Sequence, residues 1–169
     1  MSRFDDCLPF ILKMEGGYVN NPNDRGGATN KGIIQITYDV WRNKHELPLR
    51  PVKDIGEDEV HDIYKEMYWT DLPIPLDILI FDSAIQHGKG RAIKWLQNLV
   101  GTKADGLCGM NTKTLVNQYI LRFSMEKLLT EYLGVRRNFY AAIIARDSSQ
   151  QVFAKGWANR MKGIEEQLK

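Results

Sequence analysis

The sequence contains few of the side chains that bind transition metals or form cross-links. Among 169 residues there are two cysteines, Cys7 and Cys108, and three scattered histidines. Two cysteines so far apart match neither a zinc-ligand pattern nor the dense disulfide framework of a small secreted domain, so we interpret both as buried thiols rather than as a disulfide. No His-Glu-x-x-His motif is present. We therefore expect neither a metal site nor a cofactor.

Long apolar runs, repeats and a leader segment are also missing. No stretch approaches the roughly 20 apolar residues of a membrane-spanning helix. The first residues lack the basic start, long apolar run and small-residue cleavage site of a signal peptide, so we expect a chain that is made in the cytoplasm without one. Low-complexity tracts and repeats with a period of about 20–50 residues are absent as well, which argues against a solenoid or an array.

What is present is an ordinary globular composition. Apolar residues make up 43% and charged residues 26% of the chain, and 169 residues suffice for one domain with a proper core. The formal net charge is +2, but residues 121–169 hold nine Lys or Arg against five Asp or Glu. This surplus suits an anionic polymer such as a bacterial wall and would attract nucleic acid by the same physics, although a solvated helical face explains it equally well.

Apolar residues recur at the three- and four-residue spacing of helices along most of the chain. The first helix ends at Glu15, and Thr37 resembles the N-cap of the second. Between them, the β-branched run 32–36 predicts a short strand or the wall of a cleft. The pattern predicts a mainly α fold with at most a small sheet of two or three strands and no clear domain boundary. Later helices are expected at about residues 57–69, 76–86, 91–100, 111–121, 124–145 and 157–168.

The segment from Glu15 to Ile33 combines a helix-ending carboxylate with an unusual density of turn residues. Gly16 and Gly17 adopt positive φ without steric cost, so they are expected to stop the helix at Glu15. The consecutive turns that follow are expected to bring the Asp24 carboxylate and the Thr29 hydroxyl back toward Glu15. One loop would then present an acid, a second carboxylate and a hydroxyl together.

These three groups suit glycoside hydrolysis, in which a protonated carboxyl delivers a proton and a second polar group activates or positions the attacking species. Partial burial against apolar residues such as Met14 and Ile33 would favour the protonated form of Glu15, while Asp24 stays ionised. Simpler explanations exist for each residue taken alone. Glu15 is also typical of a surface ion pair, Asp24 of an Asx turn, and Thr29 of a side chain that satisfies loop amides.

The motif Glu15-Gly16-Gly17-Tyr18, followed by Asn-x-x-Asp-x-Gly-Gly-x-Thr-x-x-Gly-Ile at residues 21–33, resembles the signature of the glycoside hydrolase 108 family of N-acetylmuramidases. These peptidoglycan-cleaving enzymes are common among phage endolysins. The order of Glu15, Asp24 and Thr29 is also similar to the Glu–Asp–Thr triad of phage-type lysozymes, with Thr29 one residue nearer the aspartate. The resemblance implies a lysozyme-like fold with Glu15 as general acid and with Asp24 and Thr29 orienting water.

Later segments resemble the C-terminal half of the same family, which is sometimes labelled a peptidoglycan-binding domain. The resemblance implies a single lysozyme-like domain over residues 1–169, with a catalytic half of about residues 1–85 and a helical half of about residues 86–169. The matching segments are Phe81 to Gly88, Ala92 to Gln97, the pattern Asp105-Gly106-x-x-Gly109-x-x-Thr112, and Gly156 to Arg160.

Several side chains are candidates for substrate contact, although each has a structural reading when taken singly. Aromatic and amide groups near the loop would stack on a sugar or bind its N-acetyl group, and the segment 82–88 would form the opposite wall of the cleft. Trp157 is a further candidate for sugar contact. The expected substrate-binding residues are Tyr18, Asn20, Gln35, Asp82, Gln86 and His87.

The resulting prediction is a muramidase that cleaves the β-1,4 bond between N-acetylmuramic acid and N-acetylglucosamine, acting as a phage endolysin for host lysis. The alternatives are a lytic transglycosylase and, from another class, a non-catalytic wall-binding or adaptor protein. Bacterial peptidoglycan is the expected partner, with contact between the basic C-terminal helices and the anionic cell envelope, no nucleic acid, and a monomeric state. The enzyme would reach periplasmic peptidoglycan after release from the cytoplasm.

Overall fold

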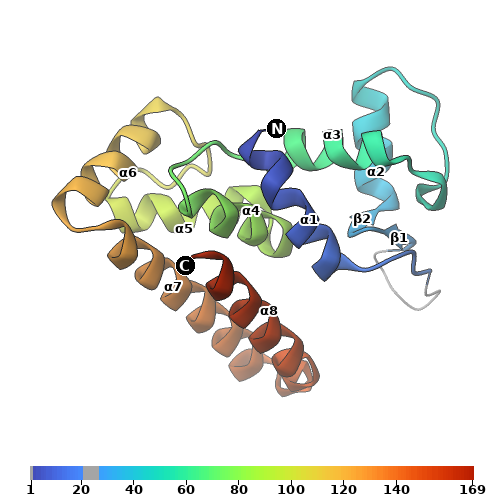
Figure 1. Ribbon diagram of the computed structural model, residues 1–169. Coiled ribbons are helices and arrows are strands. Elements are labelled where there is room, and N and C mark those ends of the chain that lie inside the picture. Colours follow the sequence, from blue (N-terminus) through green and yellow to red (C-terminus); the bar gives the residue numbers. More distant parts are fainter. Residues whose placement is uncertain (1, 21–26) are drawn as a thin grey trace. The chain divides into compact units, whose positions relative to one another are not determined.

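The computed structural model describes residues 2–20 and 27–169, and the chain groups into two compact units, Met1–Tyr68 and Trp69–Lys169. The described part contains eight α-helices, two short 3-10 helices and one two-stranded sheet (Figure 1). The prediction of a mainly α fold with a small sheet is therefore confirmed. The prediction of one domain with halves near residues 1–85 and 86–169 is not tested by this grouping. None of the described helices combines the length and apolar character needed to cross a membrane.

The first unit begins with α1 (Arg3–Glu15), whose start and end are both set by local sequence. Ser2 and Asp5 form a capping box, in which the Ser2 hydroxyl accepts from Asp5 N and the Asp5 carboxylate accepts from Ser2 N. Gly16 ends the helix with a φ of 75°, as the glycine pair predicted. One face of α1 is buried in the core of this unit, through Phe4, Cys7, Leu8 and Ile11.

A minimal hairpin follows, formed by β1 (Thr29–Asn30) and β2 (Ile33–Ile34) in antiparallel register. The turn between them is Lys31–Gly32, with φ values of 49° and 75°. Two successive positive φ values match the twist of a two-residue hairpin turn and favour glycine. Val19 pairs with Thr29 as an isolated bridge, so the segment that leaves α1 runs beside the hairpin. The expected strand at 32–36 is thus shorter than predicted.

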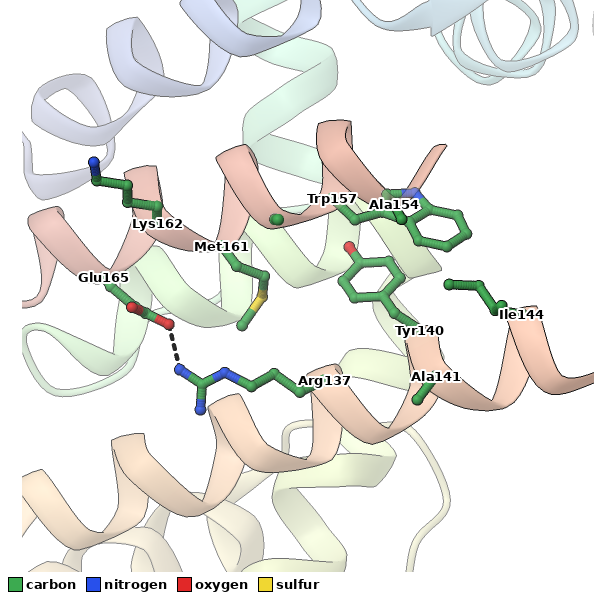
Figure 2. A pocket seen from close by; sticks show the side chains of 10 residues that line it. Arg137, Tyr140, Ala141, Ile144, Ala154, Trp157, Met161, Lys162 and Glu165 are labelled. Atoms are coloured by element: carbon green, nitrogen blue, oxygen red, sulfur yellow. Dashed lines mark hydrogen bonds and ion pairs between the residues drawn. The ribbon is translucent and has the colours of Figure 1, made fainter. Parts of the chain in front are cut away.

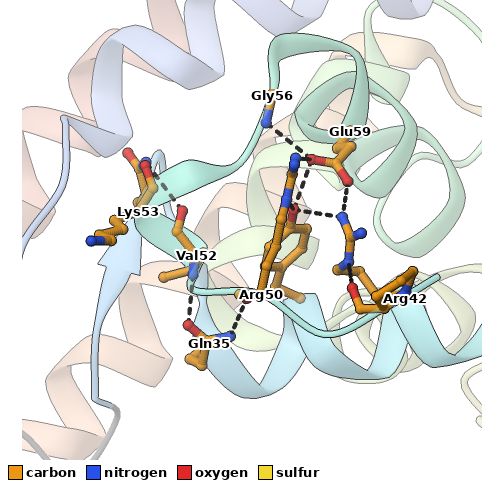
Figure 3. A network of polar contacts seen from close by, with 10 residues as sticks. Gln35, Arg42, Arg50, Val52, Lys53, Gly56 and Glu59 are labelled. Atoms are coloured by element: carbon orange, nitrogen blue, oxygen red, sulfur yellow. Dashed lines mark hydrogen bonds and ion pairs between the residues drawn. The ribbon is translucent and has the colours of Figure 1, made fainter.

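The second helix, α2 (Gln35–Lys44), starts directly after the hairpin, with Ile34 as its N-cap. The predicted cap at Thr37 is therefore wrong. The side chain of Gln35 accepts a 2.6 Å hydrogen bond from Val52 N and donates a 3.0 Å bond to Arg50 O (Figure 3). Both partners belong to the stretch around the 3-10 helix η1 (Val52–Asp54). The first turn of α2 is therefore used to hold that stretch in place.

A polar network centred on Glu59 joins α2, the loop before η1, and α3 (Glu57–Met67) (Figure 3). Glu59 accepts hydrogen bonds from the Tyr38 hydroxyl at 2.7 Å, from Gly56 N at 3.0 Å, and from the guanidinium groups of Arg42 and Arg50. Burial opposes ionisation of Glu59, but these hydrogen bonds outweigh it and lower the pKa of its carboxyl. The network fixes residues 50–56 onto the two helices.

The second unit is built around α4 (Leu76–His87), in which every residue from 76 to 84 is buried. This confirms the prediction that the apolar segment 76–86 is central to its surroundings. It contacts α5 (Lys89–Val100), α7 (Met125–Arg146) and α8 (Ala154–Gln167). The remaining elements are α6 (Met110–Arg122) and η2 (Ser148–Phe153). The starts of α5 and α8 lie two and three residues earlier than predicted.

A buried charge cluster ties these helices together. Asp82, which is 0% exposed, lies 2.8 Å from both Arg160 Nε and Arg136 Nη2. The two arginines come from α8 and α7, so one carboxylate on α4 binds both neighbouring helices. Two of the nine cations counted in residues 121–169 are thereby buried on a carboxylate outside that range. The basic surplus on the surface is correspondingly smaller than the sequence predicts.

The pattern Asp105-Gly106-x-x-Gly109-x-x-Thr112 closes the loop between α5 and α6. Gln97, 1% exposed, donates from its amide to Asp105 Oδ1 at 2.8 Å and to Thr112 Oγ1 at 3.1 Å, and accepts from Gly106 N at 2.9 Å. Asp105 also accepts a 2.8 Å bond from Leu107 N. Gly106 has a φ of 83°, which favours glycine. The motif therefore has a structural role as a clasp on Gln97.

Candidate active site

Glu15 is the last residue of α1 and is half-buried. Its carboxylate lies against the turn of the hairpin. A Cβ added to Gly32 would stand 2.7 Å from Glu15 Oε2, 2.8 Å from Glu15 Cγ and 2.6 Å from the Tyr64 hydroxyl. Because each of these oxygens is within 2.7 Å of the same point, they are close neighbours. Only glycine at position 32 leaves room for both.

Two tyrosines lie near this carboxylate: Tyr64 within α3, and Tyr68 at the C-cap of that helix. Tyr64 is 1% exposed, and its hydroxyl donates a 2.7 Å hydrogen bond to the carbonyl of Lys31. The ring of Tyr68 lies 5.6 Å from that of Tyr64. Burial raises the pKa of Tyr68, a hydrogen bond with Thr37 lowers it, and the nearby Glu15 charge raises it. Glu15 is thus held where the end of α1, the hairpin turn and α3 meet.

The other two expected catalytic residues have different outcomes. Thr29 lies in β1, where its backbone N–H and C=O each make a 2.8 Å hydrogen bond with Val19. This bridge places Thr29 beside the segment that follows α1. Asp24 lies outside the described residues 2–20 and 27–169. The roles of Asp24 and Thr29 in orienting water stay predictions.

Three expected substrate contacts belong to the first unit. Tyr18, 47% exposed, and Asn20 lie on the surface after α1, where both side chains are open to a ligand. The side-chain amide of Gln35 bonds Val52 and Arg50, as described above. Gln35 positions the chain around η1, and its contact with substrate stays a prediction. Substrate contact by Tyr18 and Asn20 stays a prediction.

The three expected substrate contacts on α4 differ in their burial and in their partners. Asp82 is buried in the ion cluster with Arg136 and Arg160, so the expectation that it lines a cleft wall is corrected. Gln86, near the C-terminus of α4, is partly exposed and its substrate contact stays a prediction. The sequence pattern around Asp82 did not reveal this ion cluster, because Arg136 and Arg160 lie more than 50 residues further along the chain. The carboxylate was therefore predicted to be functional.

His87 packs in an aromatic cluster rather than on an open wall. Its ring centroid lies 5.1 Å from that of Trp95 and 5.2 Å from those of Phe139 and Tyr140. Burial, and then the positive charge of Arg136, lower the pKa of His87 to about 4. The imidazole is therefore neutral at neutral pH, and its placement favours a packing role over the expected contact with substrate.

Sequence reasoning missed Gly32 and Tyr64 as parts of the site. Gly32 belongs to the recognised motif. Glycine is needed there because the Glu15 and Tyr64 side chains, which come from other segments, approach it closely. Tyr64 lies on the apolar face of α3, a position that by itself is typical of a core residue. Its hydroxyl reaches a carbonyl 33 residues earlier in the chain. No local signal in the sequence reveals that contact.

The chemistry available at this site is that of a positioned carboxyl group beside a phenol. Within the part of the chain that the structure describes, no group of three or more His, Cys, Asp or Glu side chains is arranged to hold a metal ion. A carboxyl fixed at a helix end by a closed turn is suited to general acid–base work, for which geometry is the first requirement.

Comparison with known proteins extends these observations. A family model described as Glycosyl hydrolase 108 matches residues 8–88, and one described as Predicted Peptidoglycan domain matches residues 91–162. The solved structure of Brucella abortus SagA is similar to this chain, with 32% sequence identity and a TM-score of 0.77. The similarity covers 94% of this chain and 89% of that one. A search of curated protein sequences gave no match.

Fold, site and family matches together define a glycoside hydrolase that acts on peptidoglycan, with a lysozyme-like, mainly α fold. The chain belongs to the glycosyl hydrolase 108 family. The resemblance drawn from the sequence motifs is thereby confirmed.

Proposed function

We propose that the protein is an N-acetylmuramidase, which hydrolyses the β-1,4 bond between N-acetylmuramic acid and N-acetylglucosamine in peptidoglycan. The observation that carries the proposal is the position of Glu15. This residue ends α1, and its carboxyl packs against the Gly32 turn beside the Tyr64 hydroxyl. In this role Glu15 protonates the leaving glycosidic oxygen. Asp24 and Thr29 orient the attacking water. No cofactor takes part.

The nearest alternative is a lytic transglycosylase, which also needs one acidic residue but lets the 6-hydroxyl of the sugar attack. Hydrolysis gives a reducing end that carries one water more than the 1,6-anhydro product. Asp24 favours hydrolysis, because a second carboxylate is useful where water must be positioned. A non-catalytic wall-binding protein is the alternative from another class, and it predicts no released fragments at all.

The test compares wild type, Glu15→Gln and Glu126→Gln on purified bacterial sacculi. Glu126 is an exposed carboxylate in the first turn of α7, so its substitution makes the same chemical change away from the site. We expect Glu126→Gln to clear walls like wild type and Glu15→Gln to lose clearing while it stays folded and still binds walls. Mass analysis of wild-type fragments should give reducing N-acetylmuramic acid ends. Full activity of Glu15→Gln, or 1,6-anhydro products, would refute the proposal.

We also propose that the enzyme acts in host lysis as a phage endolysin, made in the cytoplasm and admitted to periplasmic peptidoglycan on release. The likeness of the Glu15–Ile33 motif to phage enzymes supports this role. Cells that express the chain alone should keep growing, and they should lyse once the inner membrane is permeabilised. Lysis without permeabilisation would contradict the proposed release step.

A further inference from the structure

A pocket of about 470 Å³ opens between α7 and α8 in the second unit (Figure 2). This volume is within the range of about 300–1,000 Å³ found for small-molecule sites. Small and apolar side chains, among them Ala141, Ala158 and Met161, form much of its lining. Its described lining residues all belong to residues 137–165 of this unit, so the pocket shares none of them with the Glu15 site.

One wall of the pocket is aromatic and carries a polar group with nothing to bind. The rings of Tyr140 and Trp157 are stacked, with centroids 4.7 Å apart and planes 16° from parallel. Tyr140 is only 7% exposed, yet its hydroxyl has no hydrogen-bond partner among the residues that the structure describes. Buried hydroxyls are normally paired, and each exception calls for an explanation. A ligand in the pocket that Tyr140 lines supplies one.

The rim of the pocket is charged at one end. Arg137 of α7 and Glu165 of α8 form an ion pair there (Figure 2). Lys162 stands one turn before Glu165 on the same helix and has no ion-pair partner within the described part of the chain. The rim therefore presents two cations and one anion, a net positive charge that suits a ligand with carboxylates and an amine.

We infer that this pocket binds the stem peptide of peptidoglycan, an inference that rests on the proposed function. Stem peptides combine alanine methyl groups, free carboxylates and, in many walls, the amine of a diamino acid. The methyl groups fit the alanine-rich lining, and a carboxylate pairs with Lys162. The other charged groups of the peptide extend the Arg137–Glu165 ion pair without breaking it. A glycan strand fits less well, because the described residues that line the pocket include no Asn, Gln, Ser or Thr side chain to bind sugar hydroxyls.

The probe is a synthetic stem tetrapeptide, L-alanyl-D-glutamyl-meso-diaminopimelyl-D-alanine, titrated into the full chain by calorimetry and by NMR. We expect shifted resonances around α7 and α8. Ala158→Leu, which fills the pocket, and Lys162→Glu, which reverses a rim charge, should each weaken binding about tenfold or more. Tyr140→Phe should weaken it less while the fold is kept. Lys155→Glu, an equal charge change on an exposed part of α8 outside the pocket lining, is the matched control and should change little.

Three results would overturn the inference. The first is peptide-induced shifts that lie away from α7 and α8. The second is an equal loss of affinity in Lys155→Glu and Lys162→Glu, which would indicate non-specific charge attraction. The third is binding of a peptide-free chitin tetrasaccharide at the pocket in place of the peptide. Because the peptide contains no glycosidic bond, its binding is independent of catalysis, so failure here is distinct from failure of the Glu15→Gln test.

Discussion

Replacing Gly32 with alanine tests whether activity depends on the position of the Glu15 carboxylate. The new Cβ would lie 2.6 Å from the Tyr64 hydroxyl and 2.7 Å from Glu15 Oε2, well inside an ordinary contact distance of about 3.5–4.0 Å. The carboxylate must therefore retreat by on the order of 1 Å, a displacement that can lower turnover about 10²-fold. The positive φ of 75° adds about 1–2 kcal/mol of backbone strain, and overpacking adds about 1–3 kcal/mol.

The assay measures kcat and KM on purified sacculi at a temperature where each variant is folded, together with the Tm from circular dichroism. Gly101→Ala is the matched control, because Gly101 also has a positive φ, of 76°, but no atom from elsewhere in residues 2–20 and 27–169 lies within 4 Å of the added Cβ. It should lose stability from backbone strain and keep wild-type turnover. If folded Gly32→Ala turned over at the wild-type rate, the position of the Glu15 carboxylate would not limit catalysis, and its assignment as the acid would fail.

Four further substitutions separate positioning from packing. Tyr64→Phe should lower kcat with little change in KM, since the lost hydroxyl positions the site; an unchanged kcat would contradict this. Asp82→Asn should cost about 3–5 kcal/mol of unfolding free energy, because it leaves two buried arginines uncompensated; a Tm close to wild type would show that the cluster is not needed. Gln97→Leu should cost about 1–3 kcal/mol and speed amide hydrogen exchange in residues 105–112; unchanged exchange would refute the clasp. His61→Gln should lower the Tm more at about pH 5 than at about pH 9. An equal decrease in Tm at both pH values would contradict this expectation.

The sign of the last effect follows from two pKa shifts. The hydrogen bond between His61 and Asp5, which are 3.0 Å apart, raises the pKa of His61 above 6.5 and lowers that of Asp5 from 3.8 to about 2. Stabilisation from His61 is complete below pH 6.5 and is lost as pH rises through its folded pKa. Stabilisation from Asp5 is complete above pH 3.8 and is lost as pH falls through about 2. The pair is therefore most stabilising between those two ordinary values.

Local sequence predicted the features that depend on local chemistry. The glycine after Glu15 does end α1, Thr29 does pair with Val19 just beyond that end, and the apolar run 76–86 is the buried helix of its unit. The sequence did not predict the interactions that Gln35 and Asp82 make in the structure, for one shared reason. Each is a polar residue beside a recognised motif, and each is used by partners that lie far away in sequence. Pairing over such distances depends on tertiary packing, which residue spacing does not encode.

The clasp on Gln97 bears on where the second unit meets the wall. The side chains of its motif that resemble a peptidoglycan-binding pattern point to one another: Asp105 and Thr112 both accept from the buried Gln97 amide. These groups are engaged in closing a loop, so a ligand that used them would have to break the clasp. Recognition by this unit is better sought where polar groups lack partners. The α7–α8 pocket meets that requirement, because no described residue pairs with the Tyr140 hydroxyl in its wall.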